Sequence, residues 1–515
     1  MAVITNPATG EPIAERREHA PDDALRAAEL ARGAQPEWAA TPVRARAAVV
    51  RRVAAWVVEH TDELARLVSD CTGKPRVDAL STEVLPAAIM SDYYARKAAR
   101  FLRPERLRAS TVLFVNKRST LYREPFGLVG IISPWNYPLG IPLHEVLAGL
   151  LAGNAVLLKV ATQAQPVGEA IARMLAEAGL PDHLLHVLHL PGRVSGDALL
   201  DAGVGKLFFT GSIEVGRELA LKAGERLVPV SLELGGNDAM IVREDADVAR
   251  AAACAVWAGL SNAGQSCGAV ERIYVADAVY DRFLTQLRGE VEALRSGYDD
   301  TFQVDLGSLT TEEQLQTVRR QLGESLSDRG REVVRSASAR GGRFHPAVVV
   351  EVSDEDGAIV REETFGPLLA VRRVTSDDEA LRLANDSRYG LTASVWTREG
   401  ATAARFARAL EAGAVTVNDH LLSHGMPETP WGGWKESGIG RSHSRLGFEE
   451  MTRPKVVVEE RFAWIHRNMW WPPYSREVYD GLAGALVARY GSGPMRRLSG
   501  LLRAVRLFVR RARGR

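Results

Sequence analysis

Apolar positions change their spacing along the chain near residue 111. Before it, residues 21–72 and 76–103 repeat apolar side chains at helical intervals, as in the segment 45–59. After it, short apolar runs predict buried strands at 128–132, 155–159, 184–190 and 206–209, with helices at 143–152, 167–179 and 215–223. Val112, Phe114 and the run 121–124 are also predicted to be extended. This alternation predicts an α/β fold with a doubly wound parallel sheet.

A second set of strands and helices begins after Gly235 and Gly236. Its predicted strands lie at 239–242, 271–275, 347–351 and 368–374, and its predicted helices at 246–260 and 278–295. A chain of 515 residues is also too long for one hydrophobic core. We therefore expect a second α/β domain with a boundary near residue 236.

Composition narrows the class of protein. The chain is 46% hydrophobic and 25% charged, as in ordinary globular proteins. Its three cysteines are too few for a disulfide framework, which favours a reducing compartment. The first residues lack the pattern of a signal peptide, and no apolar run is long enough to span a bilayer. The expected location is the cytoplasm.

Charge is concentrated at the C-terminal end. Residues 481–515 contain nine arginines and no acidic residue or lysine. Since the chain carries +1 and this segment +9, the first 480 residues carry −8. An acidic body does not favour a nucleic-acid partner.

The same C-terminal segment has an amphipathic pattern. From Arg496, Leu498, Leu501, Leu502, Val505, Phe508 and Val509 share one helical face, and Arg503, Arg506, Arg510 and Arg513 share the other. A basic amphipathic helix over 496–515 suits an anionic membrane surface, with a peripheral location. A helix docked on its own oligomer explains the pattern equally well.

A thiol lies in a run of small and amide residues, Asn262-Ala263-Gly264-Gln265-Ser266-Cys267. Small neighbours leave space in front of the sulfur, as a nucleophile requires. A buried, inert cysteine is the alternative. Cys71, before Thr-Gly-Lys-Pro on a predicted surface turn, and Cys254, in an alanine-rich helix, are interpreted as packing residues.

Two further segments suggest a nucleotide site. Gly211 and Ser212 follow a predicted strand and begin a helix, where backbone amides can bind phosphate, although a plain turn has the same sequence features. Lys159 ends an apolar strand, where ligands of doubly wound sheets bind, and a solvated lysine is the alternative.

Three polar residues stand out in otherwise apolar surroundings. Asn136 follows Trp135 in a loop fixed by two prolines, and a rigid amide suits an oxyanion site. Glu233 lies between two leucines at a strand end, where burial would raise its pKa and suit it to act as a general base. Glu363 is close to Phe365 on a glycine–proline loop.

Together these motifs resemble the aldehyde dehydrogenase superfamily over about residues 5–455. The resemblance is carried by six motifs in order: Pro134-Trp-Asn-Tyr-Pro138, Phe209-Thr-Gly-Ser212, Glu233-Leu-Gly-Gly236, Gly264-Gln-Ser-Cys267, Glu363-Thr-Phe-Gly-Pro367 and Pro430-Trp-Gly-Gly-Trp-Lys435 with Ser437-Gly-Ile-Gly-Arg441. It implies oxidation of an aldehyde to the acid with NAD or NADP, and no metal.

The resemblance implies a role for each matching residue. Cys267 would be the nucleophile, Asn136 the oxyanion donor together with the Cys267 amide, and Glu233 the base that activates water. Lys159 and Glu363 resemble the residues that bind the two cofactor riboses. Trp135, Gly211, Ser212 and Phe365 would complete the cofactor site.

Three positions depart from the family pattern. Thr162 stands where NAD-preferring members often carry a glutamate, so we expect NADP to be tolerated alongside NAD. Glu145 and Asn237 replace lysines that are common in the family. Any role of those lysines does not carry over.

Substrate class is narrowed by two missing arginines. Succinate-semialdehyde members carry arginines where this chain has His144 and Ser261. A neutral or apolar aldehyde is therefore favoured, medium- or long-chain or aromatic, in a tunnel lined by Tyr137 and Trp431. Succinate semialdehyde, or another small polar aldehyde, is the alternative substrate.

The resemblance also implies a domain plan. It has a cofactor-binding domain at 1–103 and 125–235, a catalytic domain at 236–450, a β oligomerisation arm at 104–124 and 451–460, and an extension at 461–515. The arm implies a homodimer or homotetramer.

Two other functions compete with hydrolytic oxidation. A non-catalytic scaffold would lack Cys267, Glu233 or Asn136, and members that transfer the acyl group to coenzyme A usually lack the glutamate. His183, His186 and His189 have a spacing that invites a metal interpretation, but structural or surface histidines are favoured because that spacing alternates faces on a strand.

Overall fold

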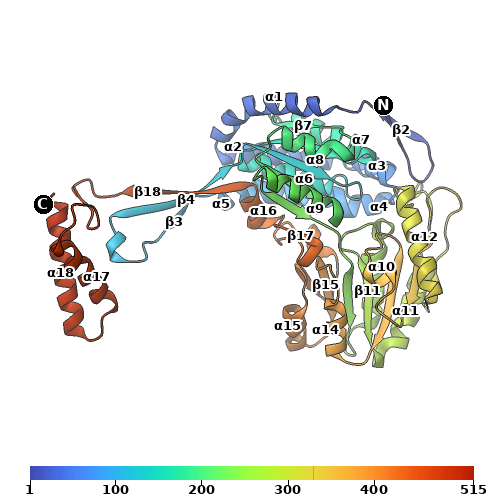
Figure 1. The fold of residues 1–515 in the computed structure, drawn as a ribbon. Helices are drawn as coiled ribbons and strands as arrows, with labels where there is room; N and C mark the ends of the chain where they lie inside the picture. The colour runs from blue at the N-terminus through green and yellow to red at the C-terminus, as the bar shows by residue number, and fades with distance from the viewer. Residues whose placement is uncertain (329, 515) are drawn as a thin grey trace. The chain divides into compact units, whose positions relative to one another are not determined.

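The computed structural model describes residues 1–328 and 330–514. It divides into two compact units, Met1–Leu102 with Glu124–Arg453, and Arg103–Arg123 with Pro454–Arg515. Figure 1 shows the elements of both.

A six-stranded sheet organises the first half of the larger unit, in the order β17-β9-β8-β5-β6-β7. Five strands are parallel, and the edge strand β17 is antiparallel to β9. The strands are β5 (Leu128–Ser133), β6 (Ala155–Val160), β7 (Leu185–Val187), β8 (Lys206–Thr210), β9 (Val230–Glu233) and β17 (Gly438–Ile439). Their side chains form continuous apolar runs because helices cover the sheet.

Helices from the N-terminal half pack around this sheet. They are α1 (Pro21–Ala40), α2 (Val43–Glu59), α3 (Thr61–Thr72), α4 (Arg76–Ala79), the π-helical η1 (Leu80–Val84), α5 (Leu85–Phe101), α6 (Gly140–Ala152), the 3-10 turn η3 (Thr162–Ala164), α7 (Gln165–Glu177), α8 (Gly192–Asp201) and α9 (Ile213–Glu225). Every residue of α6 is buried. The hairpin of β1 (Ala2–Thr5) and β2 (Pro12–Arg16) precedes them.

A seven-stranded sheet follows in the same unit, in the order β12-β13-β14-β11-β10-β15-β16. Its strands are β10 (Asp238–Val242), β11 (Val270–Ala276), β12 (Arg331–Arg335), β13 (Val348–Glu351), β14 (Leu368–Val374), β15 (Thr392–Trp396) and β16 (Ala414–Val417). All neighbours are parallel except β12 and β13.

The elements that connect these strands and follow them include seven helices and four 3-10 turns in the described chain. They are α10 (Val248–Leu260), η4 (Ser261–Gly264), η5 (Asp277–Val279), α11 (Tyr280–Glu292), α12 (Glu312–Ser327), α13 (Ala358–Arg361), α14 (Asp377–Asn385), α15 (Gly400–Ala409), η6 (Leu422–Gly425), η7 (Lys435–Ser437) and α16 (Ser444–Glu450). Separate buried clusters underlie the two sheets. The chain is an α/β protein, as predicted.

The smaller unit contains a three-stranded sheet and a helical hairpin. The sheet has the order β18-β4-β3, formed by Thr452–Glu460, Lys117–Pro125 and Glu105–Leu107. Val112 and Phe114 were predicted to be extended but form a 3-10 turn, η2 (Val112–Phe114), so that prediction is wrong. Their apolar neighbour Leu113 packs on the core of the hairpin, and this tertiary contact overrides β-propensity.

The hairpin consists of α17 (Arg476–Tyr490) and α18 (Pro494–Ala512), drawn in red in Figure 1. The helices meet through small residues. A Cβ on Gly484 would lie 2.7 Å from the Gly500 oxygen, and one on Gly500 would lie 2.6 Å from the Gly484 oxygen. Among the described residues, no helix is long and apolar enough to cross a membrane.

Candidate active site

The loop that carries Cys267 is tightly folded between α10 and β11. Asn262, Ala263 and Gly264 have φ values of 53°, 53° and 74°. A Cβ on Gly264 would lie 2.1 Å from the Gly366 oxygen, so the close approach of the two loops requires glycine. Three consecutive left-handed residues turn the chain sharply, and Cys267, which is half-buried, follows them.

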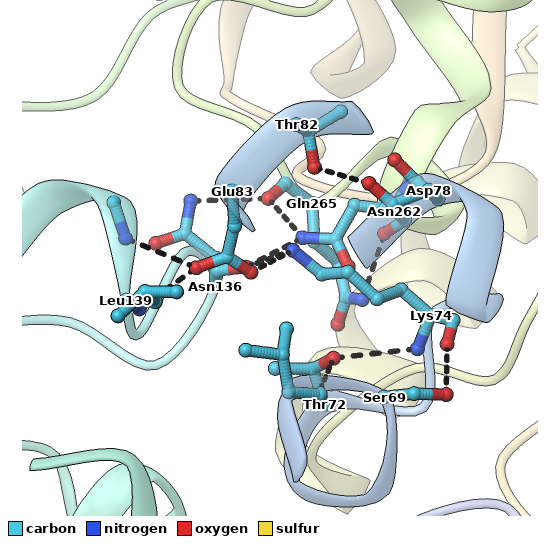
Figure 2. A network of polar contacts seen from close by, with 12 residues as sticks. Ser69, Thr72, Lys74, Asp78, Thr82, Glu83, Asn136, Leu139, Asn262 and Gln265 are labelled. Atoms are coloured by element: carbon cyan, nitrogen blue, oxygen red, sulfur yellow. Dashed lines mark hydrogen bonds and ion pairs between the residues drawn. The ribbon is translucent and has the colours of Figure 1, made fainter. Parts of the chain in front are cut away.

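Asn136 is held against this loop by hydrogen bonds from its side chain and its backbone. It follows β5, and its amide Nδ2 donates to the Gln265 oxygen at 3.1 Å. Its own carbonyl oxygen accepts a hydrogen bond from Asn262 Nδ2 at 2.9 Å. Figure 2 shows this network. The Asn136 side chain therefore has a defined orientation beside the cysteine loop.

Glu233 ends β9 and is buried. Burial, followed by the charge of Glu145, raises the pKa of Glu233 well above its ordinary value, and Arg441 opposes this rise. Its Oε2 atom has no protein hydrogen-bond partner. This oxygen is available to a water molecule.

Two cavities meet at Cys267. The larger, about 250 Å³, is a cleft that Cys267, Asn136 and Glu233 line together. The other, about 70 Å³, is a narrow tunnel that includes Cys267, Tyr137 and Trp431. The sulfur is therefore accessible from two sides.

The cleft has features that suit a dinucleotide. Trp135, Gly211, Ser212, Glu363 and Phe365 all line it. Ser212 caps the N-terminus of α9, and its hydroxyl accepts from the Val215 amide at 3.4 Å. A helix N-terminus attracts phosphate groups. Glu363 Oε1 accepts from the Gly236 amide at 3.1 Å, and Trp135 and Phe365 meet edge to face with ring centroids 5.5 Å apart.

Lys159 and Thr162 do not line this cleft in the described part of the chain. Lys159 is the penultimate residue of β6, paired with Ile132 of β5, at the carboxyl edge of the sheet from which Trp135 and Ser212 also extend. Burial lowers the pKa of Lys159 to about 8. Lys159 is buried, so it is not a solvated surface lysine.

The tunnel is mainly apolar. Besides Tyr137 and Trp431, its lining includes Pro86, Ile141, Trp257, Leu421, Leu422 and His424. None of the described lining residues is acidic, a lysine or an arginine. Ser261 does not line the tunnel but lines another pocket, which shares Trp257 and Ser81 with it.

His144 lies behind the tunnel in a cluster of three imidazoles. Its ring centroid is 4.6 Å from that of His443 and 6.4 Å from that of His424. Burial lowers the pKa of His144 to about 3 and of His424 to about 4. The imidazoles are therefore neutral at physiological pH, and no group of described residues is arranged to hold a metal ion.

The residues that replace the family lysines differ in their surroundings. Burial raises the pKa of Glu145 to about 8, and its Oε2 has no protein hydrogen-bond partner. Asn237 donates to the Val360 and Glu362 oxygens at 2.8 and 3.1 Å. Asn237 thus bonds to the C-terminal end of α13, directly before Glu363.

The surroundings of Cys267 favour the protonated form of its thiol. Burial raises its pKa, and the carboxyl groups of Glu363, Asp238 and Glu233 raise it further. A base that removes the proton must act during the reaction.

The sequence matches the family model "Aldehyde dehydrogenase family" over residues 2–457. The chain belongs to the aldehyde dehydrogenase family. It is therefore an oxidoreductase that oxidises an aldehyde with NAD or NADP.

Named aldehyde dehydrogenases and their relatives align with most of the chain. A 4,4'-diapolycopene aldehyde oxidase from Methylomonas sp is 35% identical over 92% of this chain and 88% of its own. A putative succinate-semialdehyde dehydrogenase [NADP(+)] from Mycolicibacterium smegmatis is 38% identical over 85% of each. The crystal structure of a putative aldehyde dehydrogenase from Burkholderia cenocepacia has a TM-score of 0.84 at 33% identity, covering 90% of this chain and 96% of that one.

Two residues in the Asn136 network were not predicted from the sequence. Lys74 and Glu83 form a fully buried ion pair with Nζ and Oε1 2.7 Å apart. The prediction of a surface turn at Cys71-Thr-Gly-Lys-Pro is wrong, because Cys71 and Lys74 are each about 1% exposed. A lysine between glycine and proline was the available signal, but lysines are seldom buried unless paired.

Proposed function

We propose that this aldehyde dehydrogenase oxidises apolar aldehydes to their carboxylic acids. The observation that carries the proposal is the position of Cys267, which lines both the larger cleft and the narrow apolar tunnel. An aldehyde whose chain fills the tunnel brings its carbonyl carbon to the sulfur. The name of the Methylomonas relative supports an apolar substrate.

The protein residues would act in the following order. Cys267 loses its proton to a base, and the thiolate attacks the aldehyde carbon to form a thiohemiacetal. The Asn136 amide and the Cys267 backbone N–H hold the negative oxygen. Loss of hydride from the carbon leaves a thioester on Cys267. Glu233 then accepts a proton from water, whose oxygen attacks the thioester and releases the acid and the thiol.

The cleft fits NAD or NADP. Gly235 has no side chain where a Cβ would lie 2.2 Å from Glu363 Oε2, so Glu363 and the cleft wall approach closely. Glu363 and Lys159 would hold the ribose hydroxyls, Gly211 and Ser212 the diphosphate, and Trp135 and Phe365 the nicotinamide end. When bound, the nicotinamide accepts the hydride.

Thr162 supports the use of NADP as well as NAD. It follows β6 at the start of η3, and it brings no negative charge near Lys159. Repulsion of a 2′-phosphate is therefore absent at this position.

A substrate panel tests the proposal. NAD(P)H production is measured with straight-chain aldehydes of rising length, benzaldehyde and succinate semialdehyde, with Cys267→Ala as the inactive control. We expect kcat/KM to rise with chain length. A kcat/KM for succinate semialdehyde far above that for hexanal would contradict the apolar substrate and favour the activity named for the mycobacterial relative.

We also propose a homodimer or homotetramer assembled through the three-stranded sheet. Its outer strand β18 exposes Val456 and Val458, which are 54% and 58% exposed, and an exposed strand edge is a template for pairing. Light scattering should give a mass of two or four chains, and Val456→Lys should shift it toward one.

The C-terminal hairpin supports a third proposal, peripheral binding to an anionic membrane. Helix α18 has three faces. Gly500, Ala504 and Leu507 face α17. Leu498, Leu501, Leu502, Val505 and Val509 form a second face and are 41–63% exposed. Because α17 packs on the small residues, this apolar face has no partner in the described chain.

Arginines flank the exposed apolar face, and their charge favours an anionic partner. Arg503, Arg506, Arg510 and Arg513 are exposed beside it. With no acidic residue in 481–515, the segment complements anionic lipid headgroups while the leucines enter the acyl boundary.

Vesicle sedimentation tests this surface. We expect the protein to bind phosphatidylserine vesicles, to bind phosphatidylcholine vesicles weakly, and to dissociate as salt is raised. Leu502→Asp with Val505→Asp should lower binding at least tenfold. The matched control places the same charges at Val58 and Leu221, which are 66% and 69% exposed elsewhere, and should bind normally. Concentration-dependent association of the chain without vesicle binding would assign the face to a second copy instead.

A further inference from the structure

We propose that the buried Lys74–Glu83 ion pair is a positioning device for the oxyanion donor Asn136. This inference rests on the proposed role of Asn136. Both side chains of the pair are fully buried. Removing two charges from water is costly, and the interaction between them often fails to repay that cost. The pair therefore calls for an explanation other than fold stability.

The ion pair is hydrogen-bonded to both ends of the short segment from Asn136 to Gly140. Lys74 Nζ donates to the Asn136 carbonyl oxygen at 2.9 Å. Glu83 Oε2 accepts from the Leu139 and Gly140 amides at 2.7 and 3.2 Å. Figure 2 shows the two side chains meeting beside Asn136. The ion pair thereby fixes the length and orientation of the segment from Asn136 to Gly140.

Glu83 acts as a remote cap for α6. Leu139, the residue before that helix, offers no side-chain cap, and Glu83 instead accepts from the Leu139 and Gly140 amides. A carboxylate is also favoured by the helix dipole at this end. Glu83 lies in the π-helical turn η1, a type of distortion that is frequent at functional sites.

Lys74 is itself held before its side chain reaches the loop. Its carbonyl oxygen accepts from Ser69 Oγ at 2.6 Å, and its ammonium lies 4.1 Å from the centre of the Tyr137 ring. Gly73, with φ of 83°, turns the chain inward. The ammonium group can therefore act as a fixed anchor.

The Asn136 carbonyl joins this anchor to the cysteine loop. Besides Lys74, it accepts a hydrogen bond from Asn262 Nδ2. Asn262 Nδ2 and Asn136 Nδ2 both donate to the Gln265 oxygen, each at 3.1 Å. The backbone N–H of Asn262 in turn donates to Asp78 Oδ2 at 2.6 Å. The distance between oxyanion donor and nucleophile is thus set by one connected network.

An oxyanion donor is effective when it does not have to reorganise during the reaction. Loss of the ion pair would release the Asn136 carbonyl and the start of α6 together. A misplacement of about 1 Å near reacting atoms can lower a rate by about 100-fold. The effect should fall on formation of the acyl-enzyme, and cofactor binding should remain normal.

The test compares Lys74→Met and Glu83→Gln with the wild type by the pre-steady-state rate of NAD(P)H formation. We expect Lys74→Met to lower this rate 10- to 100-fold, with an unchanged Kd for the cofactor. Glu83→Gln keeps the side-chain shape and a hydrogen-bond acceptor, so its rate should fall less than that of Lys74→Met. Arg46→Met is the matched control, because Arg46 is a buried cation bonded to the Leu151, Trp38, Ala39 and Thr41 oxygens away from the site. It should unfold more easily but react at the wild-type rate.

A double-mutant cycle separates positioning from general destabilisation. Asn136→Ala alone should lower the rate about 100- to 1000-fold. Adding Lys74→Met to Asn136→Ala should cost less than threefold more, because the donor that Lys74 positions is already absent. If the two losses multiply fully, or if both Lys74→Met and Glu83→Gln react at the wild-type rate, the inference is wrong. If Asn136→Ala or Cys267→Ala keeps full activity, the proposed function itself is wrong, whatever the result for Lys74. If Lys74→Met does not fold, Glu83→Gln decides alone.

Discussion

Glu233 owes its proposed role to its surroundings. Burial and the Glu145 charge raise its pKa well above the ordinary value, and its Oε2 has no protein partner. A carboxyl group of raised pKa is a better proton acceptor once it is ionised. The fraction ionised increases with pH, so the hydrolytic step should accelerate as pH rises.

The first prediction concerns this pH dependence. Glu145→Gln removes a carboxyl charge that raises the pKa of Glu233, so the rising limb of kcat against pH should move to lower pH. Glu233→Gln should retain the first turnover of NAD(P)H and lose at least 100-fold in steady-state turnover. Burst kinetics from pH 6 to 10 measure both. If the rising limb of kcat against pH does not move in Glu145→Gln, the charge of Glu145 does not affect the pKa of Glu233.

The second prediction concerns cofactor choice. Thr162→Glu places a carboxylate near Lys159, where it would repel a 2′-phosphate and bond a ribose hydroxyl. We expect kcat/KM for NADP to fall at least tenfold, which corresponds to about 1.4 kcal/mol, while the value for NAD is retained or increased. Thr162→Gln, which adds similar volume without charge, is the control. Equal losses with both cofactors would show that Thr162 does not contribute to selectivity.

Three candidate site residues were identified from short local motifs, and their catalytic roles stay predictions. Cys267, Asn136 and Glu233 each lie in a short motif, and the structure brings them to one cleft. Lys74 and Glu83 were not predictable, because a nine-residue separation across a π-helical turn has no signature in periodicity. The imidazole cluster could not be predicted from the sequence either, because His144, His424 and His443 come together only when distant segments pack.

At the scale of elements, strong patterns were reliable and weak ones were not. Buried strands such as β6 and β8 follow continuous apolar runs and were predicted closely. The expected strand at 184–190 is only Leu185–Val187, because it lies at the edge of its sheet. The β1–β2 hairpin has little apolar alternation and was not predicted.

The third prediction concerns the helical hairpin. Gly484→Val would place side-chain atoms against the Gly500 oxygen, so α17 and α18 would have to separate. Limited proteolysis should cut the residues after 475 at least tenfold faster, and kcat on a water-soluble aldehyde should not change. The control is Gly224→Val, because a Cβ at Gly224 has no neighbour within 4 Å. Equal protection of both variants would contradict the close packing.

At the scale of the molecule, buried ionisable groups make stability depend on pH in two directions. Burial lowers the pKa of His144 to about 3 and of His424 to about 4. Their unfolded forms take up protons below about pH 6.5, so their contribution is complete above that pH and is lost as pH falls. Glu145 and Glu271, with pKa values raised to about 8, have the opposite effect and lose their contribution as pH rises from about 4.5.

The fourth prediction follows from these signs. The free energy of unfolding should fall between pH 7 and pH 5 by about 2 kcal/mol for each buried histidine. Urea denaturation at a series of pH values measures the slope. His144→Phe should reduce the slope by about one proton, whereas replacing the exposed His183 should leave it unchanged. An identical slope in His144→Phe would show that this imidazole is protonated in the folded state.

All three thiols of the chain share one property, a raised pKa. Burial raises the pKa of Cys71 to about 12 and of Cys254 to about 11, and Cys267 follows the same direction. Peroxides and alkylating agents attack thiolates much faster than thiols. The raised pKa of Cys267 therefore predicts that peroxide inactivates the resting protein more slowly than it inactivates enzymes whose nucleophile rests as the thiolate.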